Sequence, residues 1–401
     1  MHLLLITNRY PVDADDAASP FVPYFVDALQ RCGVCVDVLT PSYSVHRGVQ
    51  GREPSRGGAE PLFVHRFESG SGTPVGSWNL ANPVNWMRLA RFVASGLREG
   101  QALCGAQRYD HILALWALPS GHFARVLSRQ HGIPYSVWCL GSDIYQWARR
   151  PVIRQQIAAI LRDAACVFGD GDDLCCRVTE WLNIDCCFLP SFRPLGGSTR
   201  PQPSGKTDAP RYLYLGRLHR TKGILELADA FALVHRVLPD ARIDYVGHGP
   251  DRTVLEAKLA DLGLGVAASV VGPSSTSEVA QELAACDFVV IPTKSDSLPL
   301  VFSEAVQACR PVIGTNIGDL GTFIRRYGVG LVAESVQLAD LAGPMLTMAA
   351  APVFSMDGRS RLLDLMDPSR AAAAFCEHAL GTAIGVPPER HSVRLGAPTR
   401  P

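Results

Sequence analysis

Lysine is scarce in this chain of 401 residues. Lysine and arginine together number 38, yet only four of them are lysine, namely Lys206, Lys222, Lys258 and Lys294. We attribute the arginine bias to genome composition, so each lysine that is present is more informative than usual. Aspartate and glutamate also number 38, which makes the formal net charge zero. Because nucleic-acid-binding proteins usually carry a basic excess, we predict that no nucleic acid is a partner.

Long hydrophobic runs are absent as well. No window of the sequence approaches the roughly 20 apolar residues that a membrane-spanning helix needs. The apolar run at residues 3–6 is too short for the core of a signal peptide, and no lysine or arginine precedes it. We therefore expect a cytoplasmic protein, with peripheral contact at the inner face of the membrane left open.

The usual signals for metals and redox cofactors are also lacking. The clustered cysteines, Cys175-Cys176 and Cys186-Cys187, are adjacent rather than separated by two residues as zinc ligands usually are. We interpret them as small buried apolar residues and expect no metal. No glycine lies between Thr7 and Phe21, so the glycine-rich fingerprint of nicotinamide and flavin sites is absent after the first predicted strand. We predict that the protein uses no cofactor.

The chain does contain short apolar runs that alternate with amphipathic stretches. This alternation is typical of a doubly wound α/β fold, and 401 residues are too many for one hydrophobic core. We predict a first domain at 1–190, a linker at 191–210 rich in proline, glycine and serine, and a second domain at 211–366. A helix at 367–385 is expected to return to the first domain, and a tail at 386–401 is expected to be disordered.

The stretch from residue 288 to residue 311 indicates an anion site. Residues 288–291 are a short β-branched run, predicted to be a buried strand, and Pro299 is placed to begin a helix. Such a helix directs unpaired backbone N–H groups out of the carboxyl edge of the sheet, where α/β folds hold phosphate. Asp296 and Glu304 flank this point, and a carboxylate beside a phosphate site usually binds vicinal hydroxyls such as those of ribose. The residues alone therefore predict a nucleotide or sugar phosphate site.

Three motifs, in order and at suitable spacing, resemble a known family. They are GRLHRTKG at 216–223, VGHGP at 246–250, and Asp296 with Glu304 ahead of RPV at 310–312. Together they are similar to the retaining GT-B glycosyltransferases, the large family that includes sucrose synthase and bacterial mannosyltransferases. The resemblance is strong from about residue 212 to 335 and looser in the first half. It implies two Rossmann-like domains that face a cleft.

The resemblance also assigns roles on the donor side. Arg217 and Lys222 would hold the diphosphate, Glu304 would accept hydrogen bonds from the ribose, and Asp296 would contact the donor sugar; these four are the predicted catalytic residues. The family usually has glutamate where this chain has Asp296. Because aspartate is shorter, the alternative role for Asp296 is to cap the helix. The alternative for Lys222 is a solvated residue at the start of a helix. The remaining residues assigned to the donor are Gly216, Gly223, Gly247, His248, Gly249, Ser297, Leu298, Pro299, Leu300 and Val301.

The departures from the family lie on the predicted acceptor side. Ser19-Pro20 stands where relatives have two glycines, and Leu140 stands where many have a histidine. We assign Ser19, Ser142 and Asp143 to this side. A basic and aromatic stretch at 145–162 beside it would suit an anionic membrane surface, with a solvated helix face as the alternative.

The resemblance implies a retaining hexosyltransferase, and the lack of a metal cluster predicts that it is metal-independent. It would move a sugar from a nucleotide diphosphate sugar to a glycan or lipid-linked acceptor, in the synthesis of cell-surface polysaccharide or glycoconjugate. Two alternatives share the architecture: a non-catalytic sugar-nucleotide-binding protein, and a nucleotide-sugar 2-epimerase, which needs acid–base groups around the sugar.

Overall fold

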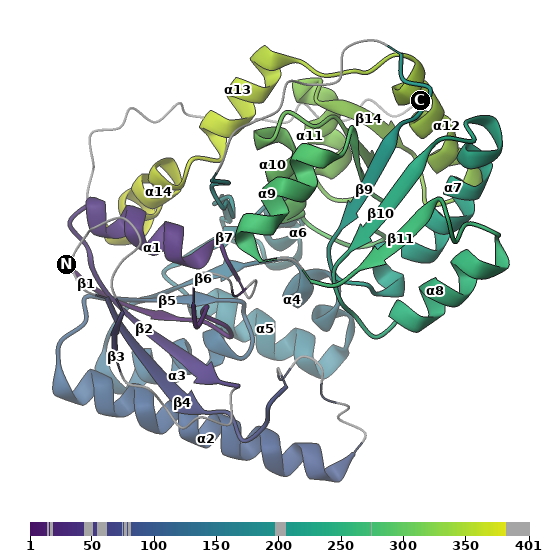
Figure 1. The fold of residues 1–401 in the computed structure, drawn as a ribbon. Coiled ribbons are helices and arrows are strands. Elements are labelled where there is room, and N and C mark those ends of the chain that lie inside the picture. The colour runs from purple at the N-terminus through teal and green to yellow at the C-terminus, as the bar shows by residue number, and fades with distance from the viewer. Residues whose placement is uncertain are drawn as a thin grey trace.

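The structure is a computed structural model of the chain. The residues that it describes are 1–13, 16, 19–43, 51–53, 62–73, 75, 78, 82–196, 206–273 and 275–381. They form two α/β units, each built on its own mainly parallel sheet with helices on both faces (Figure 1). The predicted α/β class with two doubly wound units is confirmed.

The first sheet has eight strands in the order β3-β4-β2-β1-β5-β6-β7-β8. All neighbouring pairs are parallel except β3 with β4. The strands are β1 (His2–Ile6), β2 (Cys35–Ser42), β3 (Gly51–Glu53), β4 (Leu62–Glu68), β5 (His111–Leu115), β6 (Tyr135–Cys139), β7 (Cys166–Gly169) and β8 (Cys187–Phe188).

Alternate side chains of β1 enter two separate cores, as the period of two in a strand requires. Leu4 and Ile6 pack toward α2 (Pro83–Ala106), α3 (Ser120–His131), α5 (Pro151–Asp163) and α6 (Asp172–Leu182). Leu3 and Leu5 pack toward α1 (Val22–Arg31) and α14 (Pro368–Leu380). Among the described helices, α14 is the last and α1 the first, and the two lie side by side (Figure 1); the rings of Phe25 and Phe375 meet edge to face at 6.1 Å.

The second sheet has six parallel strands in the order β11-β10-β9-β12-β13-β14. They are β9 (Arg211–Leu215), β10 (Arg242–Val246), β11 (Ala268–Val271), β12 (Phe288–Ile291), β13 (Val312–Thr315) and β14 (Gly330–Ala333). One face is covered by α7 (Ile224–Val237), α8 (Arg252–Asp261) and α12 (Leu338–Ala350). The other is covered by α9 (Thr276–Ala285), α10 (Leu300–Gln307), α11 (Leu320–Tyr327) and α13 (Met356–Leu365).

The order of strands in the second sheet changes direction between β9 and β12. These strands are hydrogen-bonded neighbours, although β10 and β11 lie between them in the sequence. The loop after β9 leads to α7 on one face, and the loop after β12 leads to α10 on the other. Two loops that diverge in this way leave a crevice at the carboxyl ends of the strands, where α/β sheets bind their ligands. No helix among the described residues is long and apolar enough to cross a membrane.

Candidate active site

The loops after β9 and β12 carry the residues predicted to bind the donor, and they are joined by direct contacts. The ammonium of Lys222 forms an ion pair with the carboxylate of Asp296. The backbone N–H of Lys294 donates to the carbonyl of Thr221 at 3.0 Å, and the side chain of Lys294 pairs with Glu226 on α7. Both side chains of the Lys222–Asp296 pair keep about a third of their surface exposed. The structure therefore brings two of the four predicted catalytic residues together at the open edge of the sheet.

Glycines let the neighbouring loops touch through their backbones. Gly223 has a φ of +72°, and a Cβ there would lie 1.9 Å from the carbonyl oxygen of Pro292. Gly247 has a φ of +146°, and its Cβ would lie 1.9 Å from the oxygen of Gly216. Any larger residue at either position would separate the loops. These glycines have a packing reason for their presence, independent of any ligand.

Two further donor-side residues of these loops lie at the surface. Arg217 and His248 are exposed, and the Arg217 guanidinium makes no ion pair within the described part of the chain. The carbonyl of Arg217 accepts a hydrogen bond from the hydroxyl of Tyr214 at 2.8 Å, which fixes the backbone that carries the side chain. An exposed guanidinium on a fixed loop is suited to bind an anion that arrives from solvent.

Helix α10 presents an uncapped amino terminus beside the Lys222–Asp296 pair. Its N-cap residue is Pro299, and no side chain caps the first turn. Asp296 therefore does not act as a cap; its carboxylate is bonded to Lys222 and lies 3.4 Å from the Thr293 hydroxyl. Leu298 is buried in the core of the second sheet, whereas Leu300 packs against the core of the first. The half-buried Pro299 and Val301 complete this turn, whose N–H groups and helix dipole favour an anion.

The ion-pair partner of Glu304 is not one of the predicted catalytic residues. It is buried on α10 and forms an ion pair with Arg193, which follows β8 in the segment between the two sheets; each side chain is 4% exposed. Burial raises the pKa of Glu304, while the Arg193 charge lowers it. Sequence reasoning missed Arg193, because a linker arginine has no local pattern that marks it. The role of Glu304 toward ribose stays a prediction.

The predicted acceptor-side residues differ in exposure. Asp143 is fully buried, and its carboxylate accepts hydrogen bonds from the backbone N–H groups of Ala117 at 3.0 Å and Ile144 at 3.2 Å. Burial raises the pKa of Asp143, and these N–H groups lower it. Asp143 thus holds the loop after β5, whereas Ser142, at the start of α4 (Ser142–Tyr145), and Ser19 keep some exposed surface.

Loops from the first sheet meet the second unit through a carboxyl-rich contact. The Asp319 carboxylate accepts from the backbone N–H of Asp173, in the first turn of α6, at 3.0 and 3.1 Å. A Cβ on Gly171 would lie 2.1 Å from Asp319 and 2.6 Å from the Ser297 hydroxyl. Asp170 Oδ1 and Ser297 Oγ are buried there without a hydrogen-bond partner among the described residues. The two units therefore touch through carboxyl groups whose ionised form is disfavoured by burial.

Asp319 predicts a pH dependence for this contact. The pKa of Asp319 is raised from 3.8 to about 7, chiefly by burial and also by the nearby Asp172 and Asp173 charges, against the backbone N–H groups, which lower it. A raised pKa means that the folded state binds the proton more tightly, so this contribution to stability is full below pH 3.8 and is lost as the pH rises through about 7.

Replacement of Asp319 by asparagine should therefore stabilise the protein increasingly, relative to wild type, between about pH 4 and pH 7. The gain should level off above pH 7 at no more than about 4 kcal/mol, because each tenfold change in proton affinity is about 1.4 kcal/mol. Urea unfolding of both proteins across this range measures the difference. If the difference in free energy of unfolding between the two proteins does not change with pH, the raised pKa of Asp319 is contradicted.

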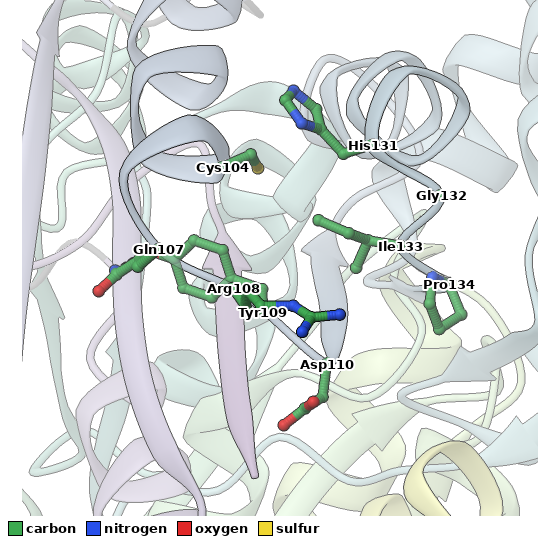
Figure 2. Close-up of a pocket in the computed structure, with 9 residues that line it drawn as sticks. All are labelled: Cys104, Gln107, Arg108, Tyr109, Asp110, His131, Gly132, Ile133 and Pro134. Atoms are coloured by element: carbon green, nitrogen blue, oxygen red, sulfur yellow. Dashed lines mark hydrogen bonds between the residues drawn. The ribbon is translucent and has the colours of Figure 1, made fainter.

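Among the described residues no metal site is found, and the cavity in Figure 2 lies away from these loops. Cys32 and Cys35 are spaced as a metal-binding pair can be, but no group of three or more histidine, cysteine, aspartate or glutamate residues within the described ranges could hold a metal. The cavity has a volume of about 310 Å³. Figure 2 shows the residues that line it, which are Cys104, Gln107, Arg108, Tyr109, Asp110, His131, Gly132, Ile133 and Pro134. It lies at the amino ends of β5 and β6, the edge of the first sheet opposite the carboxyl ends.

Comparison with known proteins agrees with this arrangement. Residues 17–182 match the family of glycosyl transferase 4-like domains, and residues 198–348 match the family of glycosyl transferases group 1. TuaC of Bacillus subtilis, a glycosyltransferase assigned to teichuronic acid biosynthesis, is 26% identical over 344 residues, which are 82% of this chain and 84% of TuaC.

Two solved structures have a similar fold. Sucrose-phosphate synthase from Thermosynechococcus elongatus superposes with a TM-score of 0.75 at 22% identity, over 94% of this chain and 97% of the synthase. HepE of Anabaena, solved in complex with UDP and glucose, superposes with a TM-score of 0.69 at 14% identity, over 95% of this chain and 100% of HepE.

Two doubly wound units are the architecture of the GT-B class, and both family matches and TuaC are glycosyl transferases. The chain belongs to the GT-B glycosyltransferases.

Proposed function

We propose that this protein transfers a sugar from a nucleotide diphosphate sugar to a glycan or lipid-linked acceptor, with retention of the anomeric configuration. The observation that carries the proposal is that Lys222 and the exposed Arg217 follow β9, while the uncapped amino terminus of α10 follows β12, the neighbouring strand at the switch point of the second sheet. Three sources of positive charge at the carboxyl ends of two neighbouring strands suit a diphosphate. In this proposal residues 211–366 form the donor domain and residues 1–190 the acceptor domain.

The proposed chemistry follows from where charge develops. As the bond between the anomeric carbon and the diphosphate oxygen breaks, negative charge accumulates on the leaving diphosphate. Fixed cations and N–H groups stabilise that charge without a metal. The acceptor oxygen then bonds to the same face of the sugar, and its proton passes to the leaving phosphate, so no separate catalytic carboxylate is required.

The acceptor and the cellular role are extrapolated from the relatives. TuaC is assigned to teichuronic acid biosynthesis, and HepE was solved with UDP and glucose. We infer a UDP sugar as the first donor to test and a cell-surface glycan as the acceptor class. We also place the protein in the cytoplasm, at the inner face of the membrane where lipid-linked acceptors lie.

The test is donor turnover. Thermal shift with UDP, GDP and ADP should single out one nucleoside diphosphate, and the matching sugar nucleotide should be consumed only when an acceptor is present. Binding without turnover would favour a non-catalytic sugar-nucleotide-binding protein. Conversion of the donor sugar to its 2-epimer without acceptor would favour the epimerase.

Asp296 tests whether the donor sugar lies at the proposed place. Replacement by asparagine removes the charge that faces Lys222 and a sugar hydroxyl, so kcat should fall about 10- to 100-fold, the equivalent of one charged hydrogen bond. Nucleoside diphosphate affinity should stay within a few fold of wild type, because other groups hold the nucleotide. Replacement by glutamate, the residue usual in the family, should preserve or raise kcat.

Asp229 provides the matched control for Asp296. It pairs with Lys258 at 2.7 Å on helices α7 and α8, with similar exposure. Asp229→Asn should leave kcat unchanged. Equal kcat for wild type and Asp296→Asn would remove Asp296 from the mechanism.

A further inference from the structure

The carboxyl-terminal half of helix α10 is held by the segment that joins the two sheets. Glu304 forms the ion pair with Arg193. One turn further, the side-chain amide of Gln307 donates to the carbonyl of Arg193 at 2.9 Å, and its oxygen accepts from the backbone N–H of Leu195 at 2.8 Å. Residues three apart lie on the same helix face, so one side of α10 is bonded to the joining segment at three points.

The carboxyl end of the same helix is also bonded to α13. The Arg359 guanidinium of α13 donates to the carbonyl of Val306 at 3.0 Å and to that of Gln307 at 2.9 Å. A helix of eight residues is too short to be stable by itself, and its position depends on such tertiary contacts. Because α10 is held at its carboxyl end, these contacts determine where its amino terminus lies beside the Lys222–Asp296 pair.

The joining segment is itself attached to both units. The carbonyl of Leu189 accepts from the indole N–H of Trp138 in β6 at 2.9 Å, and Leu189 lies in the core of the first sheet. Phe192 and Leu195 pack against the core of the second sheet. Residues 190–195, where Arg193 lies, are therefore one of the two stretches of chain that connect the units; the other precedes α14.

We infer that Arg193 is a positioning residue, which acts through Glu304 and Gln307 to set the amino terminus of α10 and so links the arrangement of the two units to the donor site. The inference rests on the proposed function. A displacement of about 1 Å in a group that positions substrate can cost roughly 100-fold in rate, so the loss of this link should be visible in kinetics. Lysine cannot reproduce the planar fork of a guanidinium, and it should replace arginine only in part.

The experiment is a double-mutant cycle in the full chain, with Arg193→Met, Glu304→Gln and the double variant, assayed well below their melting temperatures. The nucleoside diphosphate identified by thermal shift is used for calorimetry, and kcat and KM are measured for its sugar nucleotide. Arg193→Met should lower kcat/KM at least tenfold, and Arg193→Lys should recover part of the loss. In the Glu304→Gln background, Arg193→Met should cost less than threefold, because its partner is already altered.

Leu259→Ala in α8 is the control for lost stability, since Leu259 is buried in the second unit and has no part in the contacts of α10. It should lower Tm by a cavity effect without changing kcat/KM. If Arg193→Met lowers Tm in the same way while kcat/KM stays within twofold, or if the two substitutions are additive, the inference is wrong. If Arg193→Met does not fold, Gln307→Leu, which removes the other two bonds, should give the same loss in kcat/KM. A wild-type protein that binds no nucleoside diphosphate would instead refute the proposed function.

Discussion

Replacement of Lys222 by alanine is expected to weaken nucleoside diphosphate binding by about 1.5–3 kcal/mol, which is roughly 10- to 150-fold in Kd. Lys222 lies in the loop after β9, next to the uncapped amino terminus of α10, with part of its side chain exposed to the crevice. A diphosphate bound there would replace solvent around the ammonium by a direct charged hydrogen bond. Calorimetry with the wild-type and variant proteins measures the difference.

Two further variants separate the causes of this loss. Lys294→Ala removes a lysine of similar exposure from the adjacent loop, where it pairs with Glu226, and it should change the affinity less than threefold. The double variant Lys222→Ala/Asp296→Asn removes the carboxylate that Lys222 neutralises. If the double variant binds as tightly as wild type, Lys222 serves only to screen Asp296. Equal losses for Lys222→Ala and Lys294→Ala would indicate a diffuse effect of charge.

Replacement of Gly223 by alanine is expected to destabilise the protein by about 2–5 kcal/mol. A φ of +72° costs an ordinary residue about 1–2 kcal/mol. The new Cβ would also lie 1.9 Å from the Pro292 oxygen, and relief of such overlap typically costs a further 1–3 kcal/mol. Because Pro292 begins the loop that carries Asp296, relief of the overlap should separate Lys222 from Asp296 and abolish donor binding.

Gly263 is the matched control for this prediction. It has a φ of +70°, and a Cβ there would meet no atom within 4 Å. Gly263→Ala should therefore lower the free energy of unfolding only by the cost of a positive φ, about 1–2 kcal/mol. It should leave donor binding intact. Urea unfolding and calorimetry on both variants provide the comparison. Equal free energies of unfolding for the two variants would show that the close approach of the loops at Gly223 adds nothing to the destabilisation.

Local patterns in the sequence determined the class of fold and much of the donor side. The run at 288–291 is strand β12, and helix α10 begins directly after Pro299, because β-branched residues and a proline act within a few positions of themselves. The motif at 216–223 placed Lys222 and Gly223 at a strand–helix junction, and β9 with α7 forms that junction. Such features depend on neighbours in the chain, so a sequence can show them directly.

Only the tertiary structure decided which distant residues meet. Lys222 and Asp296 are 74 positions apart and face each other because β9 and β12 are neighbours in the sheet. Glu304 pairs with Arg193 because the segment after β8 crosses α10, and Asp319 bonds to α6 because the two units touch there. Each contact depends on strand order and on the packing of one unit against the other. No local pattern records that information, since the residues involved are ordinary charged side chains until the fold brings them together.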